Sequence, residues 1–174
     1  ERDAQRVYEA IIKRMELFGL ELSKEKTRIL PFGRYSGSRE TFDFLGFTHF
    51  NSKTRKGYYS VGHKISRKKK KQFKSNLKKW VKENRNTQFD EFMKALNKKL
   101  TGSFNYYSLS GMIREVRNLW QHSLYVTFKW LNRRSQRRSF KLERFYEIWN
   151  DRIIHPYIHV DIWSSDKVIY NKNV

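Results

Sequence analysis

RKKKKQFKSNLKKWVK, residues 67–82, combines two patterns that decide the fold of this part of the chain. Phe73, Leu77 and Val81 recur at helical spacing, which predicts an amphipathic helix over about residues 66–83. Most other positions are basic, with nine Lys or Arg residues among these sixteen. A few lysines on a helix usually form a solvated face, but this density with almost no acidic neighbours favours contacts with nucleic-acid phosphates.

The charge of the whole chain points to the same kind of partner. The 174 residues include 38 Lys and Arg against 17 Asp and Glu, a net charge of +21. Residues 61–100 alone carry 14 basic and 3 acidic residues, and their net charge of +11 is more than half of the excess. Nucleic acid is therefore the first expected partner and an anionic membrane surface the second. A membrane-bound helix needs large free apolar residues, which here are expected to pack on neighbouring helices, so no membrane partner is predicted.

Composition excludes several classes of protein. Aromatic residues make up 16% of the chain, which is typical of a folded core and not of a disordered basic tail. The chain has no cysteine, so disulfides, thiol nucleophiles and cysteine-ligated zinc are excluded. No apolar run approaches the roughly 18 residues of a membrane span, and the first residues show no apolar signal region. A cytoplasmic protein is the expectation.

The first third of the chain predicts one helix followed by short strands. Apolar residues recur at helical spacing over residues 3–18, and Gly19 follows as a helix stop. Strand-like segments separated by turn-forming residues are predicted at residues 27–30, 41–47 and 58–61. A helix with a small β-meander indicates the edge of an α+β domain, at residues 1–62.

The rest of the chain predicts a basic, all-helical domain at residues 63–163, with a tail at 164–174. Thr87 is expected to cap a helix whose apolar face contains Phe92 and Leu96, and Gly102 is expected to interrupt it. A long helix is predicted over about residues 111–134. The last helix is expected to begin near Ser139 and to end at His155-Pro156. Together with the N-terminal part, the predicted fold class is α+β.

A second basic cluster lies at a predicted helix junction. It contains Arg133, Arg134, Arg137 and Arg138. Arginines near a helix C-terminus complement the helix dipole, but their bidentate donors also suit phosphate, and nucleic-acid contact is the preferred interpretation.

Aromatic residues raise a further possibility, because rings often stack on the bases of single-stranded RNA. Those on apolar stripes, such as Trp80, Trp120 and Trp149, are expected in the core. For four tyrosines core packing and stacking remain equally open, namely Tyr58, Tyr59, Tyr106 and Tyr107.

The sequence offers little support for catalysis or metal binding. It lacks a nucleophile elbow, a glycine-rich phosphate loop and a paired Asp-Asp, and two-metal phosphoryl transfer requires clustered carboxylates. Asp43 stands alone in a strand-like segment and is expected to be structural. His155 and His159 are four residues apart, but Pro156 lies between them, which disfavours a helical metal site. No catalytic and no metal-binding residue is predicted.

Four stretches, in order, resemble the C-terminal half of a group II intron reverse transcriptase/maturase. They are GLELSKEKTR at residues 19–28, FDFLGF at 42–47, LNKKLTGSFNYY at 96–107 and WLNRRSQRRSF at 130–140. The resemblance implies the edge of the reverse transcriptase palm in residues 1–62 and a helical thumb, or maturase-specific X domain, in residues 63–163.

The resemblance also implies roles for particular residues. Phe44, Leu45, Gly46 and Phe47 would form the primer grip, which supports the primer strand. Two basic groups would face intron RNA or an RNA–DNA template–primer duplex: Arg67, Lys68, Lys69, Lys70, Lys71, Lys74 and Lys78, and then Arg133, Arg134, Arg137 and Arg138. In this family the intron RNA performs the splicing chemistry, and the protein stabilises its active fold.

The family's catalytic Tyr-x-Asp-Asp motif is not in the chain and is expected just before Glu1. The chain alone is therefore expected to be inactive as an RNA-directed DNA polymerase. Fingers and palm would be supplied as a missing N-terminal portion. No cofactor is predicted in this chain, and Mg²⁺ is expected for the complete polymerase. The alternatives are a standalone RNA-binding splicing factor or chaperone, and a general basic nucleic-acid-binding protein without polymerase activity.

Overall fold

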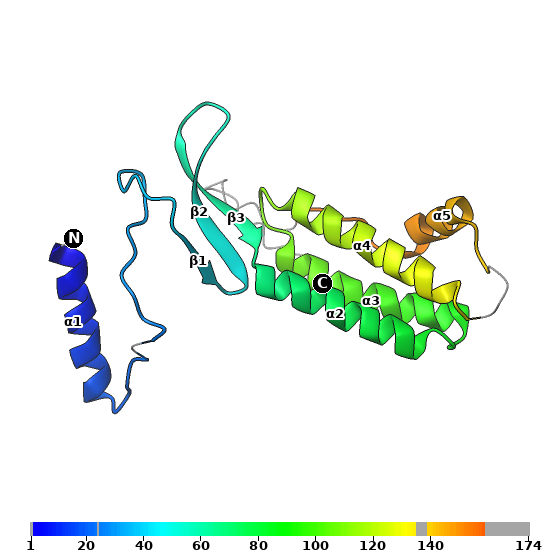
Figure 1. Ribbon diagram of the computed structural model, residues 1–174, viewed down its shortest axis with the longest axis horizontal. Coiled ribbons are helices and arrows are strands. Elements are labelled where there is room, and N and C mark those ends of the chain that lie inside the picture. The colour runs from blue at the N-terminus through cyan, green and yellow to red at the C-terminus, as the bar shows by residue number, and fades with distance from the viewer. Residues whose placement is uncertain (1, 24, 135–138, 159–174) are drawn as a thin grey trace, which may run out of the picture. The chain divides into compact units, whose positions relative to one another are not determined.

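The computed structural model describes residues 2–23, 25–134 and 139–158 (Figure 1), and these residues form five helices and a three-stranded sheet. The predicted α+β class is confirmed. None of the helices in the described ranges is long and apolar enough to cross a membrane. In chain order the elements are α1 (Arg2–Leu17), β1 (Thr41–Phe44), β2 (Phe47–Lys53), β3 (Tyr59–Ile65), α2 (Arg67–Asn84), α3 (Phe89–Tyr107), α4 (Ile113–Leu131) and α5 (Leu142–Arg152).

The chain divides into two compact units. The N-terminal unit contains residues 1–42 and 50–61, and the helical unit contains residues 43–49 and 62–174. In the N-terminal unit, the side chain of Asn51 connects two segments: its Oδ1 accepts hydrogen bonds from the Gly33 amide and the Tyr59 hydroxyl, at 3.3 and 2.9 Å. Asn51 therefore joins the loop at Gly33 to β3, and the rings of Phe32 and Phe42 also make contact in this unit, with centres 5.0 Å apart.

The predicted strand at residues 27–30 is wrong. The Thr27 amide and hydroxyl both donate to the Ser23 carbonyl, at 3.0 and 2.9 Å, so the chain turns here instead of extending. A threonine hydroxyl that bonds to its own backbone competes with strand pairing, and this local bond is invisible to a β-propensity argument.

The three strands follow one another in the order β1-β2-β3. The segment predicted as one strand over residues 41–47 is two strands joined by a turn. Leu45 and Gly46 occupy this turn with φ of +48° and +82°, and positive φ at both central residues is what a tight two-residue hairpin requires. The strand predicted at residues 58–61 is confirmed as the beginning of β3, which continues to Ile65.

The helical unit is built on an apolar core shared by its four helices. Figure 1 shows α2, α3 and α4 lying side by side, with α5 against α4. Each helix contributes fully buried side chains, including Leu77 and Val81 of α2, Phe92, Leu96, Leu100 and Phe104 of α3, Val116 and Leu119 of α4, and Phe145 and Trp149 of α5. The helical stripes predicted from the sequence are thus the core-facing stripes.

Several helix boundaries differ from the predictions. Gly102 does not interrupt α3, because buried Leu100 and Phe104 on either side outweigh the roughly 1 kcal/mol that a helix glycine costs. Gln88, not Thr87, caps α3: its side-chain oxygen accepts a hydrogen bond from the Glu91 amide at 2.9 Å. The last helix begins at Leu142 after Lys141, which makes no side-chain cap bond, and ends at Arg152. The predicted tail at residues 164–174 lies outside the described residues.

Candidate nucleic-acid interface

The packing of α2 turns most of its basic residues toward solvent. Leu77 and Val81 are buried against the other helices, and each residue advances about 100° around the helix axis. The exposed positions from one edge of this stripe round to the opposite side are mostly basic. We call these residues the basic face of α2: Arg67, Lys68, Lys71, Lys74, Lys78, Lys79 and Lys82.

Two of the predicted lysines lie elsewhere on α2. The Lys70 ammonium forms a salt bridge of 2.6 Å with the Glu115 carboxylate of α4, and both side chains are partly buried. Lys69 lies on the opposite flank, where its aliphatic stem passes close to Gly46. Of the residues predicted on this helix, the structure therefore brings Arg67, Lys68, Lys71, Lys74 and Lys78 together, and it separates Lys69 and Lys70 from them.

The first turn of α2 concentrates positive charge at the positive end of the helix dipole. Ser66 caps the helix by accepting a hydrogen bond from the Lys69 amide at 3.4 Å. The first turn contains no acidic residue, although helices gain stability from acidic side chains there. This arrangement is unfavourable for the isolated helix, and its positive potential suits an anionic ligand.

A second group of cations surrounds the Trp130 ring near the end of α4. Lys82 and Arg85 come from the C-terminal end of α2, and Arg133 comes from the residues after α4. Their charged groups lie 5.8, 5.5 and 5.3 Å from the centre of the ring, within reach of cation–π attraction. Arg85 was missed by sequence reasoning, although it lies only three residues beyond the basic run.

Arg134 differs from its neighbour Arg133. Its guanidinium is partly buried, and this burial lowers its pKa. Two of its nitrogens, Nε and one terminal nitrogen, are buried without a hydrogen-bond partner in the described part of the chain. Arg133 is exposed, so only Arg133 presents an open charge here. The predicted Arg137 and Arg138 lie outside the described residues.

The turn between β1 and β2 belongs to the helical unit, and hydrogen bonds to its backbone carbonyls connect it with the start of α2 and the end of α3. The Tyr106 hydroxyl donates a hydrogen bond of 2.5 Å to the Leu45 carbonyl, and the Ser66 amide donates one of 2.9 Å to the Gly46 carbonyl. Phe47 is buried and stacks on Tyr106, with ring centres 5.7 Å apart. The predicted primer-grip residues thus divide in two: Phe47 anchors the turn, whereas Phe44 and Leu45 are 60% and 67% exposed.

His63 and His122 add little positive charge near neutral pH. Burial, and then the nearby charge of Lys74, lowers the pKa of His122. Burial, and then the neighbouring His49, lowers the pKa of His63. The Nδ1 atoms of His49 and His63 are 2.9 Å apart. Lowered pKa values keep His63 and His122 neutral, so lysine and arginine supply the charge of the interface.

The described residues do not fit a magnesium site of the polymerase kind. In the ranges that the structure describes, no three His, Asp or Glu side chains come together. Asp43 accepts a hydrogen bond from the Thr48 hydroxyl at 2.5 Å within the hairpin, and His155 stacks on Trp120. His159 lies outside the described residues. No chemical step is therefore assigned to a metal held by these side chains.

Part of the helical unit is similar to a known protein family. Residues 70–147, from α2 into α5, match the family model of the group II intron maturase-specific domain, which confirms the expected resemblance. No curated protein and no solved structure gave a match. The matched residues include most of the basic face of α2 and the cations around Trp130. Residues 70–147 are therefore similar to the group II intron maturase-specific domain.

Proposed function

We propose that the basic face of α2 binds the phosphate backbone of group II intron RNA and thereby promotes intron splicing. The observation that carries this proposal is the charge of α2: seven exposed cations share one side of the helix, and its first turn has no acidic residue. Lys70 is the one α2 residue in a salt bridge within the described chain, so no cation of the basic face is paired in this way. A polyanion would relieve the resulting repulsion.

The cations around Trp130 extend this surface. Lys82 belongs to the basic face and also lies over the Trp130 ring, so the two groups of cations are continuous along α2. Arg133 and Arg85 add guanidinium groups, which bind phosphate in a bidentate manner. An RNA backbone that follows α2 would therefore meet lysines first and arginines at the C-terminal end of the helix.

The protein's contribution to splicing would be binding energy. A protein that binds the active fold of an RNA more tightly than its other folds shifts the population toward the active fold. The intron RNA would then perform the chemistry, and none of the side chains described above needs to react. Binding energy alone would thus let the protein promote a reaction without reactive side chains of its own.

A role in RNA-directed DNA synthesis would use the same surface together with the hairpin turn. Exposed Phe44 and Leu45 would touch the primer strand, and the bonds from Tyr106 and Ser66 would hold their turn in place. The catalytic carboxylates and Mg²⁺ would come from a fingers and palm portion outside this sequence. The template–primer duplex would then lie against α2.

A membrane-surface role is disfavoured by the packing of α2. A helix that lies on a membrane inserts its apolar face between lipids. In this protein Leu77 and Val81 of that face are 2% and 0% exposed. The same helix therefore has only its charged side available, which suits an RNA backbone.

The test measures binding to folded group II intron RNA and to random RNA across a series of salt concentrations. The variant Lys68→Ala/Lys71→Ala/Lys78→Ala removes three exposed charges of the basic face. Each lost phosphate contact should lower the salt slope by about 0.9, so a decrease of roughly 2–3 is expected. The matched control, Lys53→Ala/Arg55→Ala/Lys56→Ala, removes three exposed charges near the β2–β3 turn and should keep most of the slope.

Two results would contradict the proposal. Equal affinity for folded intron RNA and random RNA at every salt concentration would contradict the maturase role and leave a general basic binder. An unchanged slope in the α2 variant would mean that the basic face is merely solvated. Reverse transcription is tested separately, by adding the fingers and palm portion and comparing Leu45→Ala with the unaltered chain in primer extension.

A further inference from the structure

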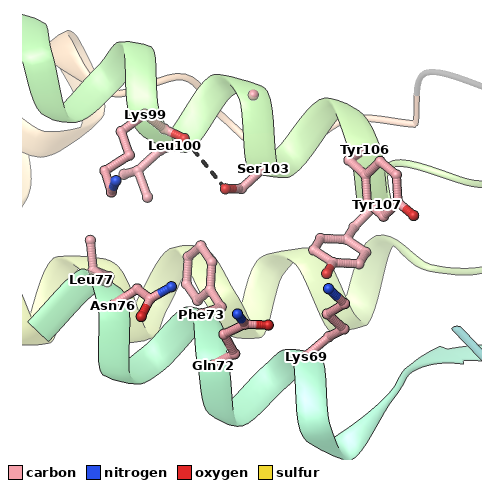
Figure 2. Close-up of a pocket in the computed structure, with 11 residues that line it drawn as sticks. Lys69, Gln72, Phe73, Asn76, Leu77, Lys99, Leu100, Ser103, Tyr106 and Tyr107 are labelled. Carbon is pink, nitrogen blue, oxygen red and sulfur yellow. Dashed lines mark hydrogen bonds between the residues drawn. The ribbon is translucent and has the colours of Figure 1, made fainter. Parts of the chain in front are cut away.

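A groove between α2 and α3 lies beside the basic face of α2 but is not part of it. Its volume is about 510 Å³, within the range of about 300–1,000 Å³ that is usual for small-ligand sites. Figure 2 shows its two walls: Phe73, Gln72 and Asn76 project from α2, and Ser103 and Leu100 face them from α3. Because Leu77 and Leu100 are buried, the floor of the groove is apolar.

Two side-chain amides of the groove are open for a ligand. The amides of Gln72 and Asn76 lie on either side of the Phe73 ring (Figure 2), and neither has a hydrogen-bond partner in the described residues. An amide has both donors and acceptors, which matches the mixed edge of a nucleobase. An aromatic ring between two such amides offers stacking and edge recognition at one place.

Positive charge lies at both ends of the groove. Lys69 is at the end near Tyr107, and Lys99 is at the other end (Figure 2). Neither lysine forms a salt bridge within the described chain, and no carboxylate lines the groove. An acidic peptide would also be attracted, but the aromatic ring and the paired amides fit a base better than a carboxylate.

The lack of a side chain at Gly46 leaves room for the aliphatic stem of Lys69. A Cβ at residue 46 would lie 3.3 Å from the Lys69 Cγ, closer than most Cβ contacts. The turn that carries Gly46 is itself fixed by the Tyr106 hydroxyl and the Ser66 amide. The turn thus supports the stem of Lys69 and holds its charged end beside Tyr107, which is the end of the groove.

We propose that this groove receives one unpaired nucleotide of the RNA bound on α2, an inference that rests on the proposed function. The base stacks on Phe73 and places its edge against Gln72 and Asn76. The flanking phosphates lie at Lys69 and Lys99. Lys68 of the basic face directly precedes Lys69 in the sequence, so a strand held on that face has a short path into the groove.

The test compares two RNA hairpins that differ by one nucleotide. One has a fully paired stem, and the other has the same stem with a single unpaired nucleotide. The full chain should bind the second at least about fivefold more tightly, the factor that corresponds to the lower end of base–aromatic stacking, about 1 kcal/mol. A 5-iodouridine at the unpaired position should cross-link on irradiation to the peptide that contains Phe73 or Tyr107.

Matched variants locate the effect. Gln72→Ala/Asn76→Ala removes two exposed amides of the groove and should reduce the preference to about onefold, with affinity for the paired stem unchanged within about twofold. Asn118→Ala/Gln121→Ala removes two exposed amides of α4 and should keep the preference. Both pairs of residues are exposed. Unfolding temperatures equal to that of the unaltered chain would show that neither change disturbs the fold.

The outcomes separate this inference from the proposed function. Tight binding of both hairpins with equal affinity would overturn the groove assignment and leave the RNA-binding role of α2 intact. It would also leave the groove to another class of ligand, such as a peptide. A preference that survives in the Gln72/Asn76 variant would overturn the assignment as well. Failure to bind either hairpin at low salt would overturn both proposals.

Discussion

Helices α1 and α2 are both amphipathic and of similar length, but they bury very different amounts of apolar surface. In α2, Leu77 and Val81 are 2% and 0% exposed. In α1 no residue is buried, and Val7 and Leu17 are 58% and 85% exposed. Amphipathic spacing therefore predicts that a helix has an apolar side, but it does not predict that this chain covers it.

The difference extends to what stabilises each helix. Tertiary packing supplies most of the stability of a helix in a protein, and isolated helices of about this length are marginal in water. Helix α2 shares a core with three other helices, whereas α1 has its own backbone bonds and a side-chain bond between Gln5 and Glu9 at 3.2 Å. The two units should consequently respond differently to the same kind of substitution.

The largest expected difference comes from one substitution placed in each unit. Leu96→Ala removes a fully buried side chain from α3 and should lower the free energy of unfolding of the helical unit by about 2–5 kcal/mol. Leu17→Ala removes an exposed one from α1 and should change stability by no more than about 0.5 kcal/mol. Urea unfolding followed by tryptophan fluorescence measures the first effect, because all five tryptophans lie after residue 79.

Hydrogen exchange provides the matching measurement for α1, which contains no tryptophan. Its amides should exchange much faster than those of α3 in the unaltered protein. A loss of stability of several kcal/mol in Leu17→Ala would contradict the comparison, because it would show that the apolar side of α1 is covered in solution.

A smaller difference is expected between two glycines with positive φ. Gly46→Ala places a Cβ at φ +82° and 3.3 Å from Lys69, so it should destabilise the helical unit by about 1–3 kcal/mol. Gly37→Ala should lower the free energy of unfolding by only about 1 kcal/mol, the cost of a left-handed backbone conformation for alanine, because nothing lies within 4 Å of the added carbon. Only Gly46→Ala should shift the urea unfolding transition that is followed by tryptophan fluorescence. Equal shifts in both variants would mean that the two units unfold together.

The sequence predicted the helical unit well because its signals are local and repeated. Leu77, Phe92, Leu96 and Trp149 were all assigned to core-facing stripes, and all are buried. The hairpin was predicted less well. Its strands were expected from β-forming residues, but the turn at Leu45 and Gly46 depends on backbone bonds from Ser66 and Tyr106, which lie 20 and 61 residues away in sequence.

The candidate site shows the same limit. Charge density predicted a basic helix, but it could not distinguish lysines by their neighbours. Lys70 pairs with Glu115, which is 45 residues away, and Lys69 lies over Gly46, so only tertiary structure separates them from Lys68 and Lys71. Gln72 and Asn76 carry no charge and gave no signal, although they lie four residues apart and thus on one side of the helix.

The smallest expected difference between the units is in pH dependence, and it should also be confined to the helical unit. All five histidines belong to this unit by sequence position, and none lies in residues 1–42 or 50–61. His63 and His122 have lowered pKa values in the folded protein, so between pH 7 and pH 5 the unfolded chain binds more protons than the folded one. Stability should therefore fall as the pH drops below the ordinary histidine value of about 6.5, and the loss should stop below the folded pKa values.

Linkage limits this loss to about 1.4 kcal/mol per pH unit for each histidine. His122→Gln should remove part of the dependence, because it removes one of the two groups whose protonation the fold disfavours. Lys74→Ala should also weaken the dependence, since Lys74 contributes to the lowered pKa of His122. Urea unfolding at pH 7, 6 and 5 measures the slope, and hydrogen exchange of α1 at the same pH values, corrected for intrinsic rates, serves as the internal control. A slope unchanged in both variants would place the proton uptake at another group.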